Sequence, residues 1–174
     1  MEPSAIATAR TLLRHLVATL AYRAAKVLRD APAGFGAMDF GAATRKPVLI
    51  VAHLADLMSW AGGLAEGESS WRAEGSDDWD TEVKRFFEKV ARLDRALASN
   101  ASLHGPAENQ VEKLIQGPLA DALTHVGQLA LLRGMAGAPI RPESYARAEI
   151  VVGRVGMEQA AARAEFEGDA SIHT

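Results

Sequence analysis

Apolar residues recur at intervals of three and four along four stretches of the chain, the spacing that places them on one face of an α-helix. The first stretch runs from Ser4 to Arg29, before a proline and glycine that would end a helix. Ser4 is expected to cap it, because a serine oxygen accepts from free backbone N–H groups. Its apolar stripe consists of Leu12, Leu13, Leu16, Val17, Leu20, Ala24, Val27 and Leu28.

The second stretch is apolar nearly all round, which is typical of a central, buried helix. The helix is expected to begin near Thr44, a capping residue type, and Pro47 is tolerated in its first turn. The helical pattern becomes weaker at Gly62-Gly63. The segment 31–43 before it is rich in glycine and alanine and predicts a connection that tucks a few apolar side chains against the helices.

The third and fourth stretches follow a polar, glycine-containing loop over 66–78. Capping residues at 76–78 introduce a helix from Trp79 to Leu97. The fourth helix spans 108–135, and Gly117-Pro118 should kink it, because proline lacks a backbone N–H. The residues expected to point inward are Trp79, Val83, Phe86, Phe87, Val90, Leu93, Leu97, Val111, Leu114, Ile115, Leu119, Leu129 and Leu132.

The periodicity fades after Gly137. Residues 138–142 look extended, and 145–155 fit either a short helix or an edge strand. We therefore expect a single all-α domain, with a four-helix bundle over 1–137. A short extended or irregular C-terminal segment over 138–174 packs on it and frays at its end.

Composition narrows the classes of function. A net charge of −3, without a basic patch, disfavours a nucleic-acid partner. The absence of cysteine removes disulfides, thiolate ligands and a cysteine nucleophile. The N-terminus does not look like a signal peptide, and the apolar runs are broken short of the ~18 residues that a membrane span needs. These features predict a cytoplasmic protein without a membrane partner.

Three polar residues lie on faces that the pattern assigns to the core. His53 shares its face with Leu49 and Ile50, and Asp121 and His125 lie one turn apart on a single face of the fourth helix. Burial of unpaired charges is costly, and facing helices can avoid that cost by donating all three groups to one cation. Two histidines and a carboxylate suit Zn²⁺, Fe²⁺, Mn²⁺ or Ni²⁺. The spacing equally allows a hydrogen-bonded histidine and an Asp121 that pairs with His125 or an arginine.

Two segments resemble a known family. In residues 44–60, His53 is followed by an aspartate three residues later and a tryptophan seven later, which is similar to the second helix of the DinB-like (DinB/YfiT) superfamily. Residues 121–129, DALTHVGQL, resemble the fourth-helix signature of that family, in which two histidines four residues apart precede a Gly-Gln pair. The resemblance covers about residues 5–137.

The resemblance implies a divalent metal ion bound by one histidine of the second helix and two of the fourth. His53 and His125 match the first and last of these ligands, and Asp121 replaces the middle one. An aspartate adds negative charge and a harder oxygen donor, which would shift the metal preference or mark a degenerate site. The resemblance also implies a transferase or isomerase that uses a small-molecule thiol, with the ion lowering the pKa of that thiol or of a water.

Other residues near this group have more than one interpretation. Asp56, one turn from His53, could orient its imidazole, accept a proton or pair with a first-helix arginine. Gln128 could contact a ligand or tie two helices together. Trp60 could wall a pocket or belong to the core, and the loop residue Trp71 is a candidate pocket lid.

Two alternative functions stay open. The first is a non-catalytic bundle with a degenerate metal site, acting as a homodimeric or stress-associated binding protein, which the aspartate at position 121 favours. The second is a metal-dependent hydrolase of a small ester or amide, which would use the same three ligands.

Overall fold

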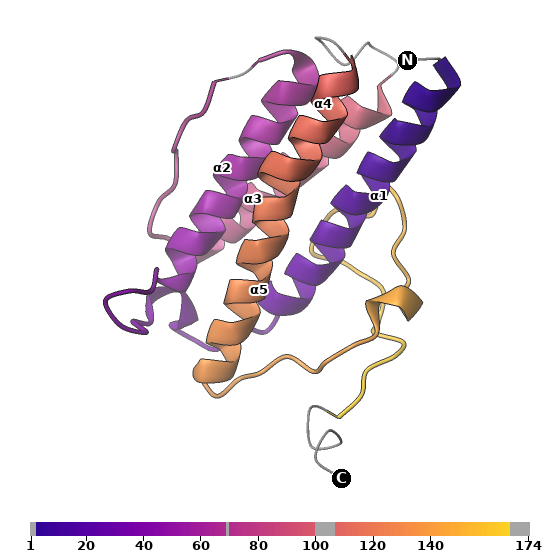
Figure 1. The fold of residues 1–174 in the computed structure, drawn as a ribbon. Coiled ribbons are helices and arrows are strands. Elements are labelled where there is room, and N and C mark those ends of the chain that lie inside the picture. Colours follow the sequence, from indigo (N-terminus) through magenta and orange to yellow (C-terminus); the bar gives the residue numbers. More distant parts are fainter. Residues whose placement is uncertain (1–2, 69, 100–106, 168–174) are drawn as a thin grey trace.

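The computed structural model describes residues 3–68, 70–99 and 107–167, and the regular elements within these ranges are all helical (Figure 1). The long helices are α1 (Pro3–Leu28), α2 (Pro47–Glu66) and α3 (Trp79–Ala98). A fourth, kinked helix consists of α4 (Ala107–Leu114), the π-helical turn η2 (Ile115–Leu119) and α5 (Ala120–Met135). Two 3₁₀ turns, η1 (Phe35–Ala37) and η3 (Tyr145–Arg147), lie in the connections.

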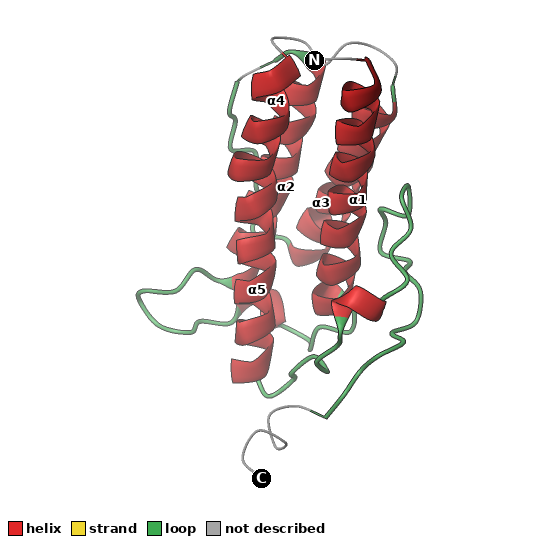
Figure 2. Cartoon of the chain, turned by 45° about the vertical axis from the view of Figure 1, so that its right-hand side comes forward, coloured by secondary structure: helices red, strands yellow, loops and turns green. Residues whose placement is uncertain are grey.

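These helices form a four-helix bundle, which confirms the predicted all-α architecture. α2 packs against α3 and α5, and α1 packs against the same two helices from the other side (Figure 2). α2 and α3 run in the same direction, opposite to α1 and α5 (Figure 1). The loop 67–78 therefore returns along the whole bundle, a distance of ~30 Å for the 20-residue α2. This long return carries loop side chains across the outer surface of α2.

The helix boundaries follow from local chemistry. α2 begins at Pro47 and not near Thr44 as predicted, because the residue before a proline avoids the helical region, and Lys46 is extended with φ −59° and ψ 144°. Asp78 caps α3 as expected by accepting a hydrogen bond from the backbone of Thr81 at 2.8 Å. α1 already includes Ser4, so the prediction of this residue as the cap was wrong.

The kink predicted at Gly117-Pro118 is confirmed. Gly117 leaves the helical region, with φ −88° and ψ −105°, inside the π-helical turn η2. A π-helical turn carries more residues than an α-helical one, so it shifts the phase of the residues around it. For this reason Ile115, expected to point inward, is 45% exposed. Leu12, at the edge of the α1 stripe, is also exposed.

α2 is the most buried helix, as its sequence predicted. An 18-residue window of this 20-residue helix has a mean hydropathy of 1.6, so the helix is long and apolar enough to cross a membrane, contrary to the expectation that no stretch would reach that length. However, 78% of that window is buried inside the bundle, as in the core helix of a soluble protein. The helix ends at Glu66, where Gly67 adopts the left-handed conformation with φ 94°.

The described part of the C-terminal segment, 138–167, lies along α1 (Figure 2). It contains one turn of 3₁₀ helix, at 145–147, in place of the short helix or strand considered for 145–155. The buried carboxylate of Glu143 accepts hydrogen bonds from Tyr22 and Lys26, both at 2.8 Å, and Lys26 also binds Glu165 at 2.7 Å. These bonds fasten the segment to α1.

Candidate metal centre

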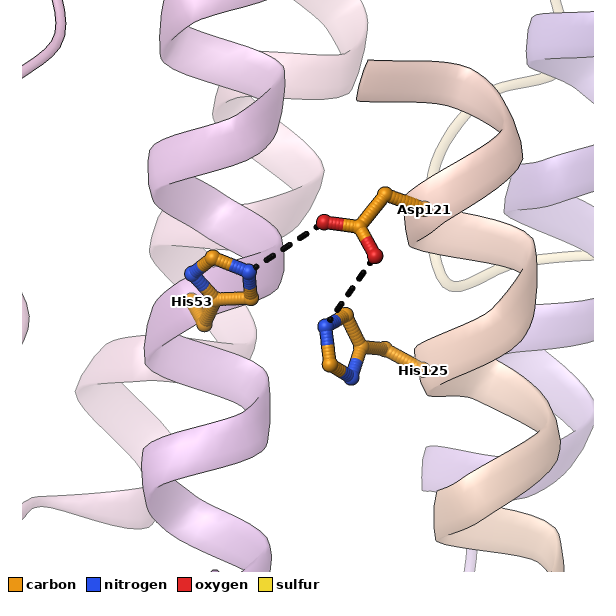
Figure 3. Close-up of side chains that lie close together, drawn as sticks. All are labelled: His53, Asp121 and His125. Carbon is orange, nitrogen blue, oxygen red and sulfur yellow. Dashed lines mark ion pairs between the residues drawn. The ribbon is translucent and has the colours of Figure 1, made fainter. Parts of the chain in front are cut away.

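His53, Asp121 and His125 converge between α2 and α5, with the carboxylate between the two rings (Figure 3). His53 Nε2 lies 3.4 Å from Asp121 Oδ2, and His125 Nε2 lies 3.4 Å from Asp121 Oδ1. The ring centroids are 4.8 Å apart and nearly perpendicular, at 89°. One ligand atom from each residue lies within 4.8 Å of those of the other two. Residues 53, 121 and 125, distant in sequence, therefore form one polar cluster.

The kinked fourth helix places two members of the cluster. Asp121 lies in the first turn of α5, directly after η2, and His125 follows one turn later. Gly117 packs against Trp60 of α2, where a Cβ atom would lie 3.5 Å from the indole ring. The bend thus occurs where the fourth helix touches α2, one turn before the polar cluster.

Gln128 fixes the orientation of the His125 ring. Gln128 Oε1 lies 2.7 Å from His125 Nδ1. Because this oxygen is an acceptor, Nδ1 carries the proton of the neutral ring and Nε2 presents its lone pair to Asp121. A lone pair and a carboxylate oxygen 3.4 Å apart repel each other unless a cation or an additional proton lies between them. The geometry therefore favours a bound positive charge at this point.

The surroundings of His53 favour its neutral imidazole, the form that binds metal ions. Burial lowers the pKa of His53 below its usual value, His125 lowers it further, and Asp121 opposes these effects. An imidazole must be unprotonated to bind a metal ion. The lowered pKa thus keeps the Nε2 lone pair available at neutral pH.

The donor set fits a first-row divalent cation. Ligand atoms at ~2.0–2.2 Å from one ion lie about 3.0–3.5 Å from each other in tetrahedral or octahedral geometry. Each carboxylate–imidazole distance, at 3.4 Å, meets this requirement, although the two distances end on different oxygens of Asp121. All three ligand atoms lie within 4.8 Å of one another, so the group would contract slightly around a single ion. Two nitrogens and one oxygen suit Zn²⁺, Ni²⁺, Fe²⁺ or Mn²⁺ and leave coordination positions open.

The cluster is more open than the helical wheel predicted. Leu49, expected on the core face beside His53, is 45% exposed, and Gln128 is exposed as well. The Asp121 side chain is 45% exposed, whereas the His125 side chain is 12% exposed. The expectation that the group lies on a buried stripe was therefore wrong for Asp121.

The indole of Trp71 lies between the ring of His53 and that of Trp60. Trp71, in the returning loop, lies 5.7 Å from the His53 ring and 5.9 Å from Trp60 between centroids. Trp60 is half-buried, and Trp71 is 45% exposed. Trp71 therefore lies beside the polar cluster, and its role as a lid stays a prediction. The loop approaches α2 closely at Gly75, where an added Cβ would lie 2.6 Å from the Cβ of Ala52.

Asp56 points away from this cluster. Its Oδ1 atom accepts hydrogen bonds from Arg85 of α3 at 2.6 Å and from the backbone of Glu74 at 3.2 Å. An ion pair was one of its predicted interpretations, but with an arginine of α1. The pattern allowed an ion pair for Asp56 and could not identify the helix that supplies its partner.

A cavity of about 380 Å³ opens beside His125 and Gln128. Thr44 and Arg45, from the segment before α2, line its outer side. The sequence pattern placed Thr44 at a helix cap and indicated no role for Arg45. The one available signal was the cationic pair Arg45-Lys46 before Pro47, of which Lys46 cannot yet be helical.

The fold and the cluster define a helical bundle with a candidate metal centre. No protein-family model matches the chain, and neither a curated protein nor a solved structure is detectably similar to it.

Proposed function

We propose that the chain is a DinB-like metal-binding protein and acts as a metal-dependent enzyme, of the transferase or isomerase type that uses a small-molecule thiol. The observation that supports the metal is the convergence of His53, Asp121 and His125, whose ligand atoms lie within 4.8 Å of one another. The resemblance of residues 44–60 and 121–129 to that family supports the type of reaction.

Each residue of the group has a distinct task in this proposal. His53 and His125 bind through Nε2, and Asp121 supplies the negative charge between them. Gln128 holds His125 in the tautomer that a ligand needs. A divalent cation in this position lowers the pKa of a thiol or a water molecule that reaches it, which generates a nucleophile at neutral pH.

Trp71 and Trp60 limit the access of water from the loop side, next to His53. The proposal gives Asp56 no proton-transfer step, because its Oδ1 atom accepts hydrogen bonds from Arg85 and from the backbone of Glu74 on the side that faces α3.

Metal analysis of the purified protein tests the proposal. We expect about one equivalent of a divalent metal in the wild type after incubation with Zn²⁺, Ni²⁺, Mn²⁺ or Fe²⁺, and almost none in a His53→Ala, His125→Ala double variant. His15→Ala is the matched control, because His15 is exposed on α1. Equal, near-zero metal in the wild type and the double variant would exclude the proposed function.

A second function is supported by one feature of the cluster. Asp121 lies 3.4 Å from both rings, so a protonated histidine on either side would close the cluster as a hydrogen-bonded network without a metal. The protein would then be a non-catalytic bundle acting through its surface. This alternative predicts that neither a chelator nor an added metal ion changes the midpoint of thermal unfolding.

The expectations of a cytoplasmic location, a homodimer and a small-molecule partner belong to this proposal. A metal-dependent hydrolase would use the same three ligands, and a screen of thiol acceptors against small esters and amides separates the two reactions.

A further inference from the structure

The cavity beside the candidate metal centre has the size of a small-molecule site. Its volume of about 380 Å³ lies at the lower end of the ~300–1,000 Å³ typical of ligand pockets. His125 belongs both to the cavity lining and to the metal group, so a molecule in the cavity can extend to the polar cluster.

Three side chains beside His125 offer hydrogen-bond donors to the cavity. Arg45 contributes a guanidinium that is exposed and makes no ion pair with any described residue. The Gln128 oxygen is engaged by His125, which leaves its amide N–H groups as donors, and Thr44 contributes a hydroxyl. No carboxylate is among the lining residues within the described ranges. A lining of this kind complements an anion and disfavours a cationic ligand.

The remaining walls are apolar. Ile50 and Leu132 are almost completely buried, at 2% and 3% exposure, and form a fixed inner surface. Leu131 also lines the cavity and is 66% exposed. The complementary ligand therefore combines a short hydrocarbon body with a negative charge at one end.

Arg45 and His125 line the same cavity, so a single small ligand can reach both. The guanidinium supplies a positive charge at one end of such a ligand, and a divalent cation held by His53, Asp121 and His125 would supply one at the other end.

We propose that this cavity binds a small carboxylate-bearing molecule, with its carboxylate on Arg45, its hydrocarbon body against Ile50 and Leu132, and its reacting end at His125. This inference rests on the proposed function and specifies its substrate class. Arg45 would then determine specificity for acids over neutral molecules of equal length.

Two matched thiols test the proposal. 6-Mercaptohexanoate and 6-mercaptohexanol are titrated onto the Co²⁺-loaded protein, and the thiolate-to-cobalt absorption band reports their binding. We expect the acid to bind about tenfold more tightly, and Arg45→Gln to abolish this difference, as loss of a charged hydrogen bond predicts. Lys46→Gln is the matched control, because Lys46 is the next residue, is exposed and does not line the cavity. It should preserve the preference.

Calorimetry with hexanoate and hexanamide, which lack a thiol, separates the two proposals. If both thiols produce the cobalt band with equal affinity, and Arg45→Gln does not change these affinities, the carboxylate site is overturned and the metal function stays intact. No cobalt band with either thiol, together with hexanoate binding that depends on Arg45, would overturn the metal function and support the anion site. No binding of any of the four probes would overturn both.

Discussion

Two polar residues lie one turn apart on α2 and meet very different surroundings. Asp56 faces α3, where its carboxylate is 6% exposed and is paired with Arg85. His53 faces α5, where Asp121, 45% exposed, is its partner. On the α3 side, both carboxylates are paired with one cation, because Arg85 binds Asp56 and also binds Glu82 at 2.7 Å. On the α5 side, the carboxylate of Asp121 faces the ring nitrogens of two histidines.

The difference separates a polar group that stabilises the fold from one that is arranged for a ligand. The α3-facing cluster is buried and its hydrogen bonds are made within the chain, as expected of structural groups. The α5-facing cluster is half-open and lacks a positive charge of its own between its acceptors. A bound cation would supply that charge.

The largest expected effect comes from removing the shared cation of the α3-facing cluster. Arg85→Met leaves the carboxylates of Asp56 and Glu82 buried without their partner. We expect a loss of about 3–5 kcal/mol in the free energy of unfolding, measured by urea denaturation. Arg92→Met is the control, because its ion pair with Glu66 is exposed, and it should cost at most ~1 kcal/mol. Equal effects of the two variants would contradict the assignment.

The α5-facing cluster should instead respond to metal. A cation that binds only the folded state, at 100 times its Kd, adds ~2.7 kcal/mol and raises the unfolding midpoint by about 5–10 °C. Differential scanning calorimetry with and without chelator measures this shift. His53→Ala should lose the response, whereas His15→Ala should keep it. A midpoint that is indifferent to metal in the wild type would favour the non-catalytic alternative.

Gln128 should affect metal affinity more than stability. Gln128→Ala removes the hydrogen bond that orients His125, and such changes weaken metal binding about 10–100-fold. Competition with a chromophoric chelator measures the affinity. Thr124→Ala, at an exposed position of the same helix, should leave the affinity unchanged. A similar loss in both variants would indicate a general disturbance of α5.

The returning loop provides a smaller effect. Gly75→Ala would force a Cβ against Ala52 and should cost about 1–2 kcal/mol by overpacking. Because Trp71 lies in the same loop, its fluorescence should shift towards that of a more exposed indole. Gly134→Ala, in an open position of α5, should be neutral or stabilising by up to ~1 kcal/mol. An unchanged fluorescence spectrum in Gly75→Ala would show that Gly75 does not anchor Trp71.

The smallest effect is an acid dependence that comes from Glu82 on the α3 side. Burial alone would raise the pKa of Glu82, but hydrogen bonds from Ser76 and Arg85 outweigh it and hold the pKa below its usual 4.5. The stabilisation from Glu82 is thus present above pH 4.5 and lost as the pH falls below it. The stability of Glu82→Gln should fall less steeply than that of the wild type over this range. Parallel curves would contradict the shift.

The sequence predicted the helices because their periodicity is local, and it predicted the kink because a Gly-Pro pair in the interior of a helix disrupts it. It also predicted which residues would meet at the candidate site. It could not predict that Arg85 would bind Asp56, because a helical wheel identifies a face and not the helix opposite. The inward prediction for Ile115 failed because the wheel assumes constant phase, which η2 breaks.

The π-helical turn has a consequence for how this site could arise or be lost. Such a turn holds one residue more than an ordinary turn, so a single deletion within 115–119 would restore a regular helix. The remainder of the helix would then rotate by about 100° relative to α4. Asp121 and His125 would leave their position opposite His53 together, without either codon changing. The insertion or deletion of one residue would thus assemble or separate the whole polar cluster.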